Sequence, residues 1–433
     1  MITVVDLRES AAYDDTTGAH SPQKAMHSSN LQESPAVAPL NPLTDAGLKV
    51  PLRIAGHDLV LFMEAPPLID AMVRDISAAQ KRVWLETYIF MDDAAGQAVA
   101  AALISRAAAG VDVRVIYDAV GSFSTPSGFF KLMEDSGVKV YAFRPLSQLL
   151  SQSIVFSAFN RRDHRKLLII DDEIGYFGGM NIVDQREMQT VDDVKAKHLP
   201  TSAGWRDLHV RLVGPQQEEL AASFDRLWRG LHRQRRQPSP PWPVQRMLTT
   251  PEETISFFDS RPSLKYRRPQ RVFAPLLRRA RRRIIMSMAY FIPVGQVLRE
   301  IVHARRRGVE VVVIVPGQSD VKLVQWASRH FYSYLLKLGV QIYERENQML
   351  HSKVMVIDDE WTIAGSCNLD PRSLRLNLEF LAVFRSRVMA AAVEEICMFE
   401  MQNSRRVTQQ DCEQRTWRQR ILDYTCWSFR HWL

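Results

Sequence analysis

The sequence predicts an α/β protein made of two similar units, each with a mostly parallel sheet that helices cover on both faces. Three observations support this fold class. Apolar runs of strand length alternate with helical segments, and the order of these elements occurs twice. Both series close with the same pattern, HRKLLIID at residues 164–171 and HSKVMVID at residues 351–358. A duplicated unit predicts a pseudo-two-fold arrangement in which the two patterns meet, so that an active site would lie between the units.

The two series contain the same elements in the same order. In the first, strands are predicted at 81–90, 111–119 and 137–143, with a helix at 95–110. In the second, strands are predicted at 282–293, 309–317 and 339–345, with a helix at 295–308. Each predicted helix ends in glycine, which favours helix termination, and each strand is a continuous apolar run.

The chain has 433 residues, which is more than one compact core usually needs and favours two domains. Residues 1–50 are rich in Ser, Pro, Ala, Thr and Asp, lack apolar periodicity and are predicted to be disordered. A segment rich in Pro and Arg separates the two series. These features predict a first domain at 51–232, a connection at 233–270, a second domain at 271–400 and a basic aromatic tail at 401–433.

The charge balance indicates an anionic partner. The chain holds 56 Lys and Arg residues against 48 Asp and Glu residues, a net charge of +8, which suits nucleic acid or a phospholipid surface. Its four cysteines lie in the last fifth of the sequence without metal-ligand spacing, which fits a reducing compartment. Neither a secretory signal nor an apolar stretch long enough to span a bilayer is evident, so any membrane contact is expected to be peripheral.

The repeated pattern extends past its aspartate to a glycine turn. Each copy reads H-x-K-x4-D-x6-G-[GS]-x-N, with GGMN at 178–181 and GSCN at 365–368. A histidine and a lysine two residues apart on a strand point to the same face, and the glycine turn can return the asparagine to that edge. Two facing copies would hold a phosphate between lysines and amides, with the imidazoles as nucleophile and general acid. The expected residues are His164, Lys166, Asn181, His351, Lys353 and Asn368.

The aspartates of the two copies, Asp171 and Asp358, complete the motif and are grouped with the histidines and lysines as its catalytic residues. Seven residues separate each aspartate from its histidine, so it lies past the apolar run and on the other phase of the strand. For both aspartates we therefore favour a structural role, anchoring the strand-to-turn geometry, over contact with a substrate.

This doubled motif resembles the signature of the phospholipase D superfamily. The resemblance implies a two-step reaction without metal or other cofactor. One histidine attacks phosphorus to give a phosphohistidine, the other protonates the leaving alcohol, and the roles reverse with the incoming acceptor. Carried over to this sequence, the resemblance makes His164 the nucleophile and His351 the acid and base. It also implies a carboxylate that orients each imidazole, for which Asp207 in WRDLHVRLVGP and Glu379 in LRLNLEF are the candidates.

Within that superfamily the sequence is similar to bacterial cardiolipin synthases, and above all to their class-B form. The similarity covers residues 57–433 and rests on stretches such as VWLETYIF, AYFIP and GSCNLDPRSLRLNLE. It implies a phosphatidyltransferase that moves a phosphatidyl group, typically from phosphatidylglycerol, to the hydroxyl of another phospholipid and releases glycerol. An anionic phospholipid is then the substrate, and the cytoplasmic side of the bacterial cell membrane is the expected location. Nucleic acid is not an expected partner.

Other activities within the superfamily would use the same pocket. A nuclease would suit the arginines of RRARRR at 278–283, although the solvated face of a helix explains them more simply. Nucleases of this superfamily are often single-motif chains that dimerise, so two fused motifs weigh against one. A hydrolytic phospholipase D would differ only in using water as the acceptor. A lipid-binding protein without activity is disfavoured because both His–Lys pairs are intact.

The tail RTWRQRILDYTCWSFRHWL at 415–433 is predicted to bind the membrane. Trp417, Ile421 and Tyr424 recur at helical spacing and are followed by Trp427, Phe429 and Trp432, with four arginines interleaved. Aromatic side chains favour the headgroup boundary, and arginines favour anionic lipids. The alternative is an ordinary amphipathic helix that packs on the second domain.

Overall fold

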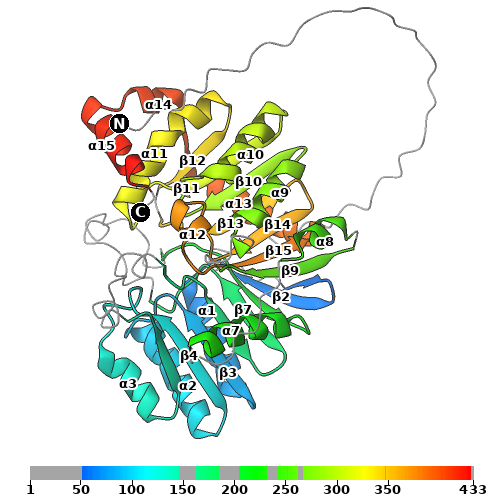
Figure 1. Ribbon diagram of the computed structural model, residues 1–433, viewed down its shortest axis with the longest axis vertical. Helices are drawn as coiled ribbons and strands as arrows, with labels where there is room; N and C mark the ends of the chain where they lie inside the picture. The colour runs from blue at the N-terminus through cyan, green and yellow to red at the C-terminus, as the bar shows by residue number, and fades with distance from the viewer. Residues whose placement is uncertain are drawn as a thin grey trace, which may run out of the picture. The chain divides into compact units, whose positions relative to one another are not determined.

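Two sheets of eight strands, one from each half of the chain, form the frame of the protein (Figure 1). The computed structural model describes residues 51–145, 161–184, 204–231, 242–250, 252–261, 267–346 and 348–430. These ranges all belong to the compact unit Leu43–Leu433. Within them, the central strands of the first half have counterparts in the second, in the same order.

The first sheet has the strand order β1-β2-β8-β7-β6-β3-β4-β5. Its strands are β1 (Pro51–Ile54), β2 (His57–Phe62), β3 (Arg82–Thr87), β4 (Asp112–Asp118), β5 (Lys139–Phe143), β6 (Leu167–Ile170), β7 (Ile174–Gly178) and β8 (His209–Val213). The pairs β3–β4 and β4–β5 are parallel, and β6 runs antiparallel to β3 in the middle of the sheet. The strand that follows the first histidine–lysine pair is therefore a central one.

The second sheet has the strand order β16-β12-β11-β10-β13-β14-β15-β9. Its strands are β9 (Thr254–Asp259), β10 (Arg283–Met288), β11 (Glu310–Pro316), β12 (Gln341–Arg345), β13 (Lys353–Ile357), β14 (Trp361–Gly365), β15 (Phe380–Arg385) and β16 (Ser404–Val407). Strands β10, β11 and β12 are parallel, and β13 runs antiparallel to β10 as β6 does to β3. The α/β class and the duplication that the sequence predicts are confirmed.

Strand direction differs from the expected mostly parallel arrangement, because both sheets are mixed. Among the strands that the structure describes, only β3–β5 and β10–β12 pair in parallel. The apolar run of each motif instead forms the first strand of a hairpin, β6–β7 or β13–β14, and a short turn permits only antiparallel pairing. Asp171 and Asp358 begin these turns with φ of 50° and 55°.

Helices cover both faces of each sheet. The described helices are α1 (Ala65–Ala78), α2 (Ala94–Ala108), α3 (Ser127–Asp135), α7 (Gln217–Leu231), α8 (Val244–Thr249), α9 (Gln270–Arg279), α10 (Gly295–Arg306), α11 (Lys322–Lys337), α12 (Pro371–Arg375), α13 (Arg387–Gln402), α14 (Gln409–Glu413) and α15 (Trp417–Ser428). Helices α1 and α2 share one apolar core with the outer face of the first sheet. Helices α9 and α10 share another with the outer face of the second sheet.

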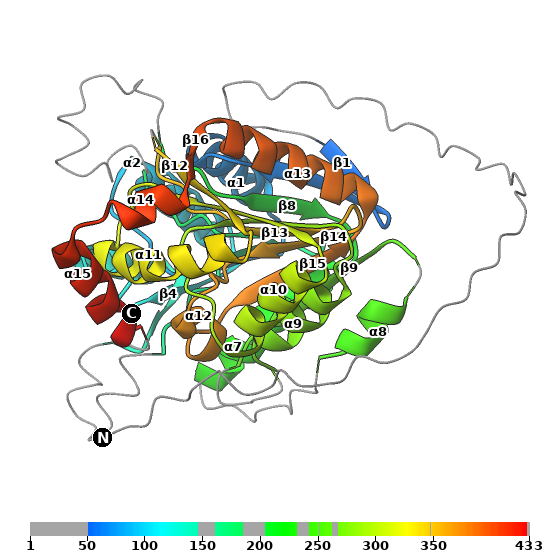
Figure 2. The same cartoon turned by 90° about the horizontal axis from the view of Figure 1, so that it is seen from above.

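The inner faces of the two sheets are turned toward each other. Each inner face carries one helix that reaches an edge strand of the other sheet, since α7 contacts β9 and α13 contacts β1 (Figure 2). Phe177 of β7 packs against Phe257 of β9 and against Phe380 and Phe384 of β15. This aromatic contact fixes one half against the other and so determines where the two motifs meet.

Two segments contribute more to the second sheet than the sequence analysis expected. The connection predicted at 233–270 supplies β9, which pairs with β15, and the tail predicted at 401–433 contains β16, which pairs with β12. Residues 1–50, predicted to be disordered, lie outside the described residues. None of the helices that the structure describes is both long and apolar enough to cross a membrane. The four cysteines are free thiols.

Candidate active site

Short backbone bridges between the halves hold both motif histidines. The N–H of His164 donates to the carbonyl oxygen of Leu378 at 2.9 Å, and the N–H of His351 donates to that of Arg206 at 2.7 Å. The residues that follow these two carbonyls, Glu379 and Asp207, are the predicted orienting carboxylates. Because the bridges cross from one half to the other, each histidine is brought beside a carboxylate of the opposite half.

The side chains of the histidines follow the same crossed pattern. Nδ1 of His164 lies 3.2 Å from Oε2 of Glu379 and 3.0 Å from the carbonyl oxygen of Ser366. Nδ1 of His351 lies 2.7 Å from Oδ2 of Asp207. A proton on Nδ1 that is donated to these oxygens leaves Nε2 of each ring for attack or proton transfer. Sequence reasoning named both carboxylates but not the crossing.

The two motif lysines belong to the same buried cluster. Each donates from Nζ to the carbonyl oxygen of the histidine two residues before it, and Nζ of Lys353 also lies 3.3 Å from Oδ2 of Asp207. Burial lowers the pKa of Lys166 to about 7; Glu379 and Asp207 oppose this effect and Lys353 adds to it. Burial also lowers the pKa of Lys353. Lys166 thus lies within electrostatic reach of charged groups from both halves.

Charge and burial oppose each other around Asp207. Burial alone would raise the pKa of this carboxyl group, but Lys353 and His351 bring it below its usual range. The backbone N–H of Leu208 also donates to its Oδ1 at 2.7 Å. Burial and the charge of Lys353 lower the pKa of His351, against the effect of Asp207. The ionised form of this carboxylate is therefore favoured, and the lowered pKa of His351 makes its imidazolium a stronger acid than that of an ordinary histidine.

The second residue of each glycine turn, Gly179 or Ser366, lies against the orienting carboxylate of its site. In the second copy, Ser366 donates a hydrogen bond from Oγ to Oε2 of Glu379. In the first copy the equivalent residue is Gly179, and a Cβ at this position would overlap both carboxylate oxygens of Asp207. The motif therefore has glycine where the carboxylate lies too close for a side chain, and serine where the side chain can bond to the carboxylate.

The motif asparagines are both buried. Oδ1 of Asn181 accepts a hydrogen bond from the backbone N–H of Ile89 at 3.2 Å. The side-chain oxygen of Asn368 meets no hydrogen-bond partner within the described residues. A buried amide oxygen without a partner is costly, so Asn368 stays a candidate for contact with a substrate: its oxygen could accept from a hydroxyl, and its NH2 group could donate to a phosphate.

The two motif aspartates lie at the opposite ends of their strands from the lysines. Asp171 follows β6, and its carboxylate accepts hydrogen bonds from the backbone N–H groups of Gln80, Lys81 and Arg82 at 2.7–3.2 Å. The carboxylate of Asp358 accepts equivalent bonds from residues 281–283 at 2.8–3.3 Å. The structure does not bring either carboxylate to the imidazoles, and these contacts favour the anchoring interpretation.

Replacement of Asp171 with asparagine is expected to lower stability rather than chemistry. Hydrogen bonds to a charged group contribute about 1.5–3 kcal/mol, so a loss of about 2 kcal/mol and a melting temperature lower by several degrees are expected. Asparagine tolerates the positive φ, so the backbone adds no strain. Thermal melting and single-turnover rates test this expectation.

Asp172→Asn is the matched control for this change. Asp172 is itself exposed and makes ion pairs with Lys81 and Arg82 at the surface, which contribute little, so its replacement should leave the melting temperature nearly unchanged. An Asp171→Asn protein with normal melting but no single-turnover chemistry would contradict the anchoring role.

Sequence analysis missed two tyrosines that lie against the imidazoles. The ring of Tyr88 is edge-on to that of His164, with centroids 5.0 Å apart, and the ring of Tyr290 is edge-on to that of His351 at 6.4 Å. Nζ of Lys166 also lies 5.2 Å from the centroid of the Tyr88 ring. The tyrosines follow equivalent strands, β3 and β10, in the stretches TYIF and AYFI. The two tyrosines could have been found by aligning the two series residue by residue, because they occupy equivalent positions after equivalent strands.

Buried ion pairs support the segment around the first histidine. Nε of Arg162 lies 3.0 Å from each carboxylate oxygen of Asp118. Nη2 of Arg165 lies 2.6 Å from Oε1 of Glu86. All four residues are buried, and breaking such a pair costs about 3–5 kcal/mol because it leaves an uncompensated charge. These pairs hold the backbone on both sides of His164 in place.

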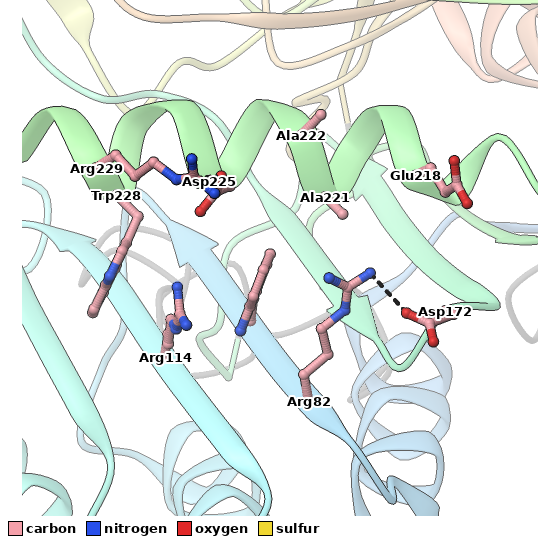
Figure 3. A pocket seen from close by; sticks show the side chains of 10 residues that line it. Arg82, Arg114, Asp172, Glu218, Ala221, Ala222, Asp225, Trp228 and Arg229 are labelled. Atoms are coloured by element: carbon pink, nitrogen blue, oxygen red, sulfur yellow. Dashed lines mark ion pairs between the residues drawn. The ribbon is translucent and has the colours of Figure 1, made fainter. Parts of the chain in front are cut away.

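A separate hollow of about 650 Å³ lies between α7 and the strands β3 and β4 (Figure 3). None of the predicted site residues lines it. Its arginines are paired with carboxylates: Arg82 with Asp172 at 3.1 Å, Arg114 with Asp112 at 2.8 Å and Arg229 with Asp225 at 2.7 Å. This pairing leaves the hollow without the excess positive charge that a phosphate site requires.

Comparison with known proteins finds the same family in both halves. The family model described as "Cardiolipin synthase, PLD-like domain" matches residues 72–195 and 273–400. The chain is 31% identical to cardiolipin synthase A of Pseudomonas putida (strain GB-1), over 83% of this chain and 71% of that protein. It is 28% identical to the cardiolipin synthase of Halalkalibacterium halodurans, over 80% of this chain and 67% of that protein. The class-B subtype stays a prediction.

Solved structures share the fold at low sequence identity. A phosphatidylserine synthase of Haemophilus influenzae Rd KW20 superposes with a TM-score of 0.61 at 14% identity, over 88% of this chain and 94% of that chain. A polyphosphate kinase of Porphyromonas gingivalis superposes with a TM-score of 0.50 at 13% identity, over 79% of this chain and 50% of that chain. At these identities the structures establish the fold alone.

Proposed function

This chain belongs to the cardiolipin synthase family with phospholipase-D-like domains and is a phosphatidyltransferase, and from that premise we propose its substrates and its mechanism. The donor is phosphatidylglycerol, the acceptor is the headgroup hydroxyl of a second phosphatidylglycerol, and the products are cardiolipin and glycerol. The observation that supports this proposal is the crossed pairing of two buried imidazoles with two carboxylates, His164 with Glu379 and His351 with Asp207.

The crossed pairs suit a double displacement. Nε2 of His164 attacks the donor phosphorus, and the bond from phosphorus to the glycerol oxygen breaks. His351 enters this step as an imidazolium, with protons on both ring nitrogens, and gives its Nε2 proton to that oxygen. The acceptor hydroxyl then attacks the phosphohistidine, its proton passes to His351, and the bond from phosphorus to His164 breaks. Glu379 and Asp207 hold the rings through Nδ1 in both steps.

Lys166 and Lys353 neutralise the phosphate in this proposal, with Asn181 and Asn368 as amide contacts. Both lysines are buried, so their charges act on the phosphate with little screening by water. A negative phosphate would in turn raise the pKa of each lysine toward its usual value. The site would therefore need no metal ion to hold the substrate charge.

Purified protein mixed with phosphatidylglycerol vesicles tests the proposed function. Equal amounts of cardiolipin and glycerol are expected, measured by lipid mass spectrometry and a glycerol assay, and EDTA should leave the rate unchanged. Phosphatidic acid as the main product would indicate a hydrolytic phospholipase D, and plasmid cleavage without lipid turnover would indicate a nuclease. Loss of activity with EDTA that magnesium restores would contradict the metal-free mechanism.

The lowered pKa of Lys166 predicts that kcat/KM for the donor lipid falls at alkaline pH. In the free enzyme this lysine loses its charge as the pH rises through about 7, and a neutral amine holds phosphate poorly. The value of kcat/KM for the donor is therefore expected to fall by about tenfold per pH unit above that point. A flat profile of kcat/KM between pH 6 and 9, at constant vesicle binding, would contradict this role of Lys166.

We also propose that the protein binds anionic membranes peripherally, on their cytoplasmic side, through α15. This helix packs on α11 (Figures 1 and 2), where Trp427 lies against His330 and Phe331. Several of its large side chains are nevertheless more than half exposed, including Tyr424, whose ring also touches that of His330. The exposed fractions are 67% for Trp417, 56% for Ile421, 56% for Tyr424 and 59% for Phe429. Trp432 lies outside the described residues.

The sequence left two alternatives for the tail, binding to the membrane or packing on the second domain. Helix α15 packs on the second domain and still exposes apolar side chains that could bind a membrane. Arg415 is paired with Asp423, and the guanidinium of Arg430 stacks on Trp427. Arg418, which lies over the Trp417 ring, and Arg420 are exposed cations beside the apolar stripe. An apolar stripe with arginines at its edge suits the headgroup boundary of an anionic bilayer.

Replacement of Trp417, Ile421 and Tyr424 together with serine is expected to weaken vesicle binding without unfolding the protein, because these side chains are exposed. Burial of each in the interface would contribute about 1.5–3 kcal/mol, so the partition coefficient should fall by more than tenfold. Sedimentation with phosphatidylglycerol vesicles measures it. Leu132→Ser, at an exposed leucine of α3, is the control. Full vesicle binding by the triple variant would move the docking surface elsewhere.

A further inference from the structure

Three side chains of the second half meet at one edge of its sheet. Strands β10 and β11 are parallel, so their carboxyl ends lie at the same edge. Tyr290 follows the end of β10, and Asp320 lies in the loop that follows β11. His351 precedes β13, which runs antiparallel to β10 and so begins at this edge.

Direct contacts join these three side chains. The hydroxyl of Tyr290 donates to Oδ2 of Asp320 at 2.7 Å, and the ring of Tyr290 lies edge-on to that of His351. The hydroxyl of Ser319 donates to Oδ1 of Asp320 at 3.3 Å. Asp320 is exposed, and its negative charge opposes the effect of burial on the pKa of both His351 and Lys353. Tyr290 therefore links an exposed carboxylate to the imidazole proposed as acid and base.

The first half has no equivalent of this carboxylate among the described residues. At the end of β4, the strand equivalent to β11, Asp118 is buried and bound by Arg162 and by the backbone N–H of Asp163. The loop that follows, residues 119–124, contains no acidic residue. The carboxylate thus comes from the half that supplies His351, the imidazole proposed to exchange its proton with an alcohol.

We propose that Asp320, held by Tyr290, forms a subsite for the second hydroxyl of a glycerol headgroup, next to the hydroxyl that reacts at His351. This inference rests on the proposed phosphatidyl transfer and names the acceptor class, a vicinal diol. An ionised carboxylate accepts about four hydrogen bonds, and two of these positions are used by Tyr290 and Ser319. The remaining positions can accept from a diol hydroxyl whose neighbour donates to Nε2 of His351.

The same subsite would serve both steps of transfer. The glycerol that leaves the donor departs from the place that the acceptor later enters, because both exchange a proton with the same imidazole. Both alcohols carry a second hydroxyl next to the reacting one. A monohydric alcohol would leave Asp320 without that partner, so the enzyme should prefer a diol to a monohydric alcohol of similar size.

Competition between two soluble acceptors tests this inference. The full-length protein receives phosphatidylglycerol vesicles with equal concentrations of 1,2-propanediol and 1-propanol, and mass spectrometry measures the ratio of the two phosphatidyl products. The unmodified protein is expected to favour the diol by about tenfold. Asp320→Ala should bring the ratio close to one, Asp320→Asn should lower it by less, and Tyr290→Phe should lower it because the carboxylate loses its anchor.

Asp359→Ala is the matched control, since Asp359 is an exposed aspartate of the same half that pairs only weakly with Arg282, at 3.4 Å. It should keep the ratio of the unmodified protein. The ratio does not depend on the total amount of active enzyme, so a variant with reduced yield still gives a result, and Asp320→Asn replaces Asp320→Ala if the latter does not fold.

Failure of this inference and failure of the proposed function give different results. Transfer from phosphatidylglycerol with the same diol preference in Asp320→Ala as in the unmodified protein would overturn the subsite alone. The same experiment is repeated with phosphatidylethanolamine vesicles as the donor. Transfer from that lipid alone would overturn the proposed donor. The ratio of the two phosphatidyl products would still test the subsite. No transfer from either lipid would overturn both.

Discussion

Replacement of either His164 or His351 with alanine is expected to abolish phosphatidyl transfer, with kcat lower by about 10⁴-fold or more. Each imidazole has a different task in the proposed double displacement, so neither can replace the other. Initial rates of cardiolipin formation on phosphatidylglycerol vesicles measure the effect. Full activity in either variant would contradict a mechanism that needs two histidines.

The loss should be one of chemistry rather than folding. Without the His164 ring, Glu379 still accepts a hydrogen bond from Ser366. Without the His351 ring, Asp207 keeps its contacts with Lys353 and with the N–H of Leu208. Thermal melting of both variants should therefore stay within a few degrees of the unmodified protein. His303→Ala, at a half-exposed histidine of α10, is the control for histidine replacement and should keep full activity.

Gly179→Ala is expected to reduce kcat by about 10²–10⁴-fold although it adds only a methyl group. The new Cβ would overlap both carboxylate oxygens of Asp207, which would have to move away from Nδ1 of His351. A displacement of about 1 Å at a reacting group costs about 10²-fold, and loss of the orienting carboxylate in a comparable triad costs about 10⁴-fold. Steady-state rates with saturating lipid measure the change.

Gly128→Ala in α3 is the matched control for this substitution, because a Cβ at Gly128 meets no atom within 4 Å. It should leave the rate unchanged. Ser366→Ala tests the second copy, where the turn residue bonds to Glu379 instead of making room for it, and a smaller fall in kcat is expected. A Gly179→Ala protein with an unchanged rate would show that the position of Asp207 does not limit the chemistry.

The residues of the candidate site could be predicted from the sequence because the motif occurs twice at equivalent places. His164, Lys166, His351 and Lys353 come together in the structure because each pair lies where a central strand begins. Local spacing alone is enough for this, since residues two apart on an extended chain share a face. Each motif aspartate lies seven residues after its histidine, an odd number, so it is on the opposite face of the strand and at its far end.

The crossing of the carboxylates could not be predicted in this way. It depends on bridges between segments more than 140 residues apart, such as that between Arg206 and Leu350, and local sequence carries no record of such pairings. Asp320 likewise belongs to no repeated motif, and its loop has a different composition from its counterpart in the first half. The crossing follows from the packing of the two halves, and the contact of Asp320 with Tyr290 follows from the fold of the second half.

Strand direction was mispredicted for a related reason. A fully buried strand is apolar along its whole length whether its neighbours are parallel or antiparallel, so composition does not distinguish the two. The hairpins β6–β7 and β13–β14 decide the direction. The edge strand β9 was missed because the arginines and prolines on both sides of it favoured a connection, while its own pairing with β15 comes from the tertiary fold.

Trapping of the covalent intermediate tests the central claim most directly. The His351→Ala protein would be mixed with a phosphatidyl ester of p-nitrophenol, a leaving group that departs without protonation, and quenched for peptide mass spectrometry. The first step should then proceed, while the second stalls without a base for the acceptor hydroxyl. The proposed mechanism predicts one p-nitrophenol per active site and a phosphatidyl group on His164. Release of p-nitrophenol without any phosphatidyl adduct on His164 would contradict it.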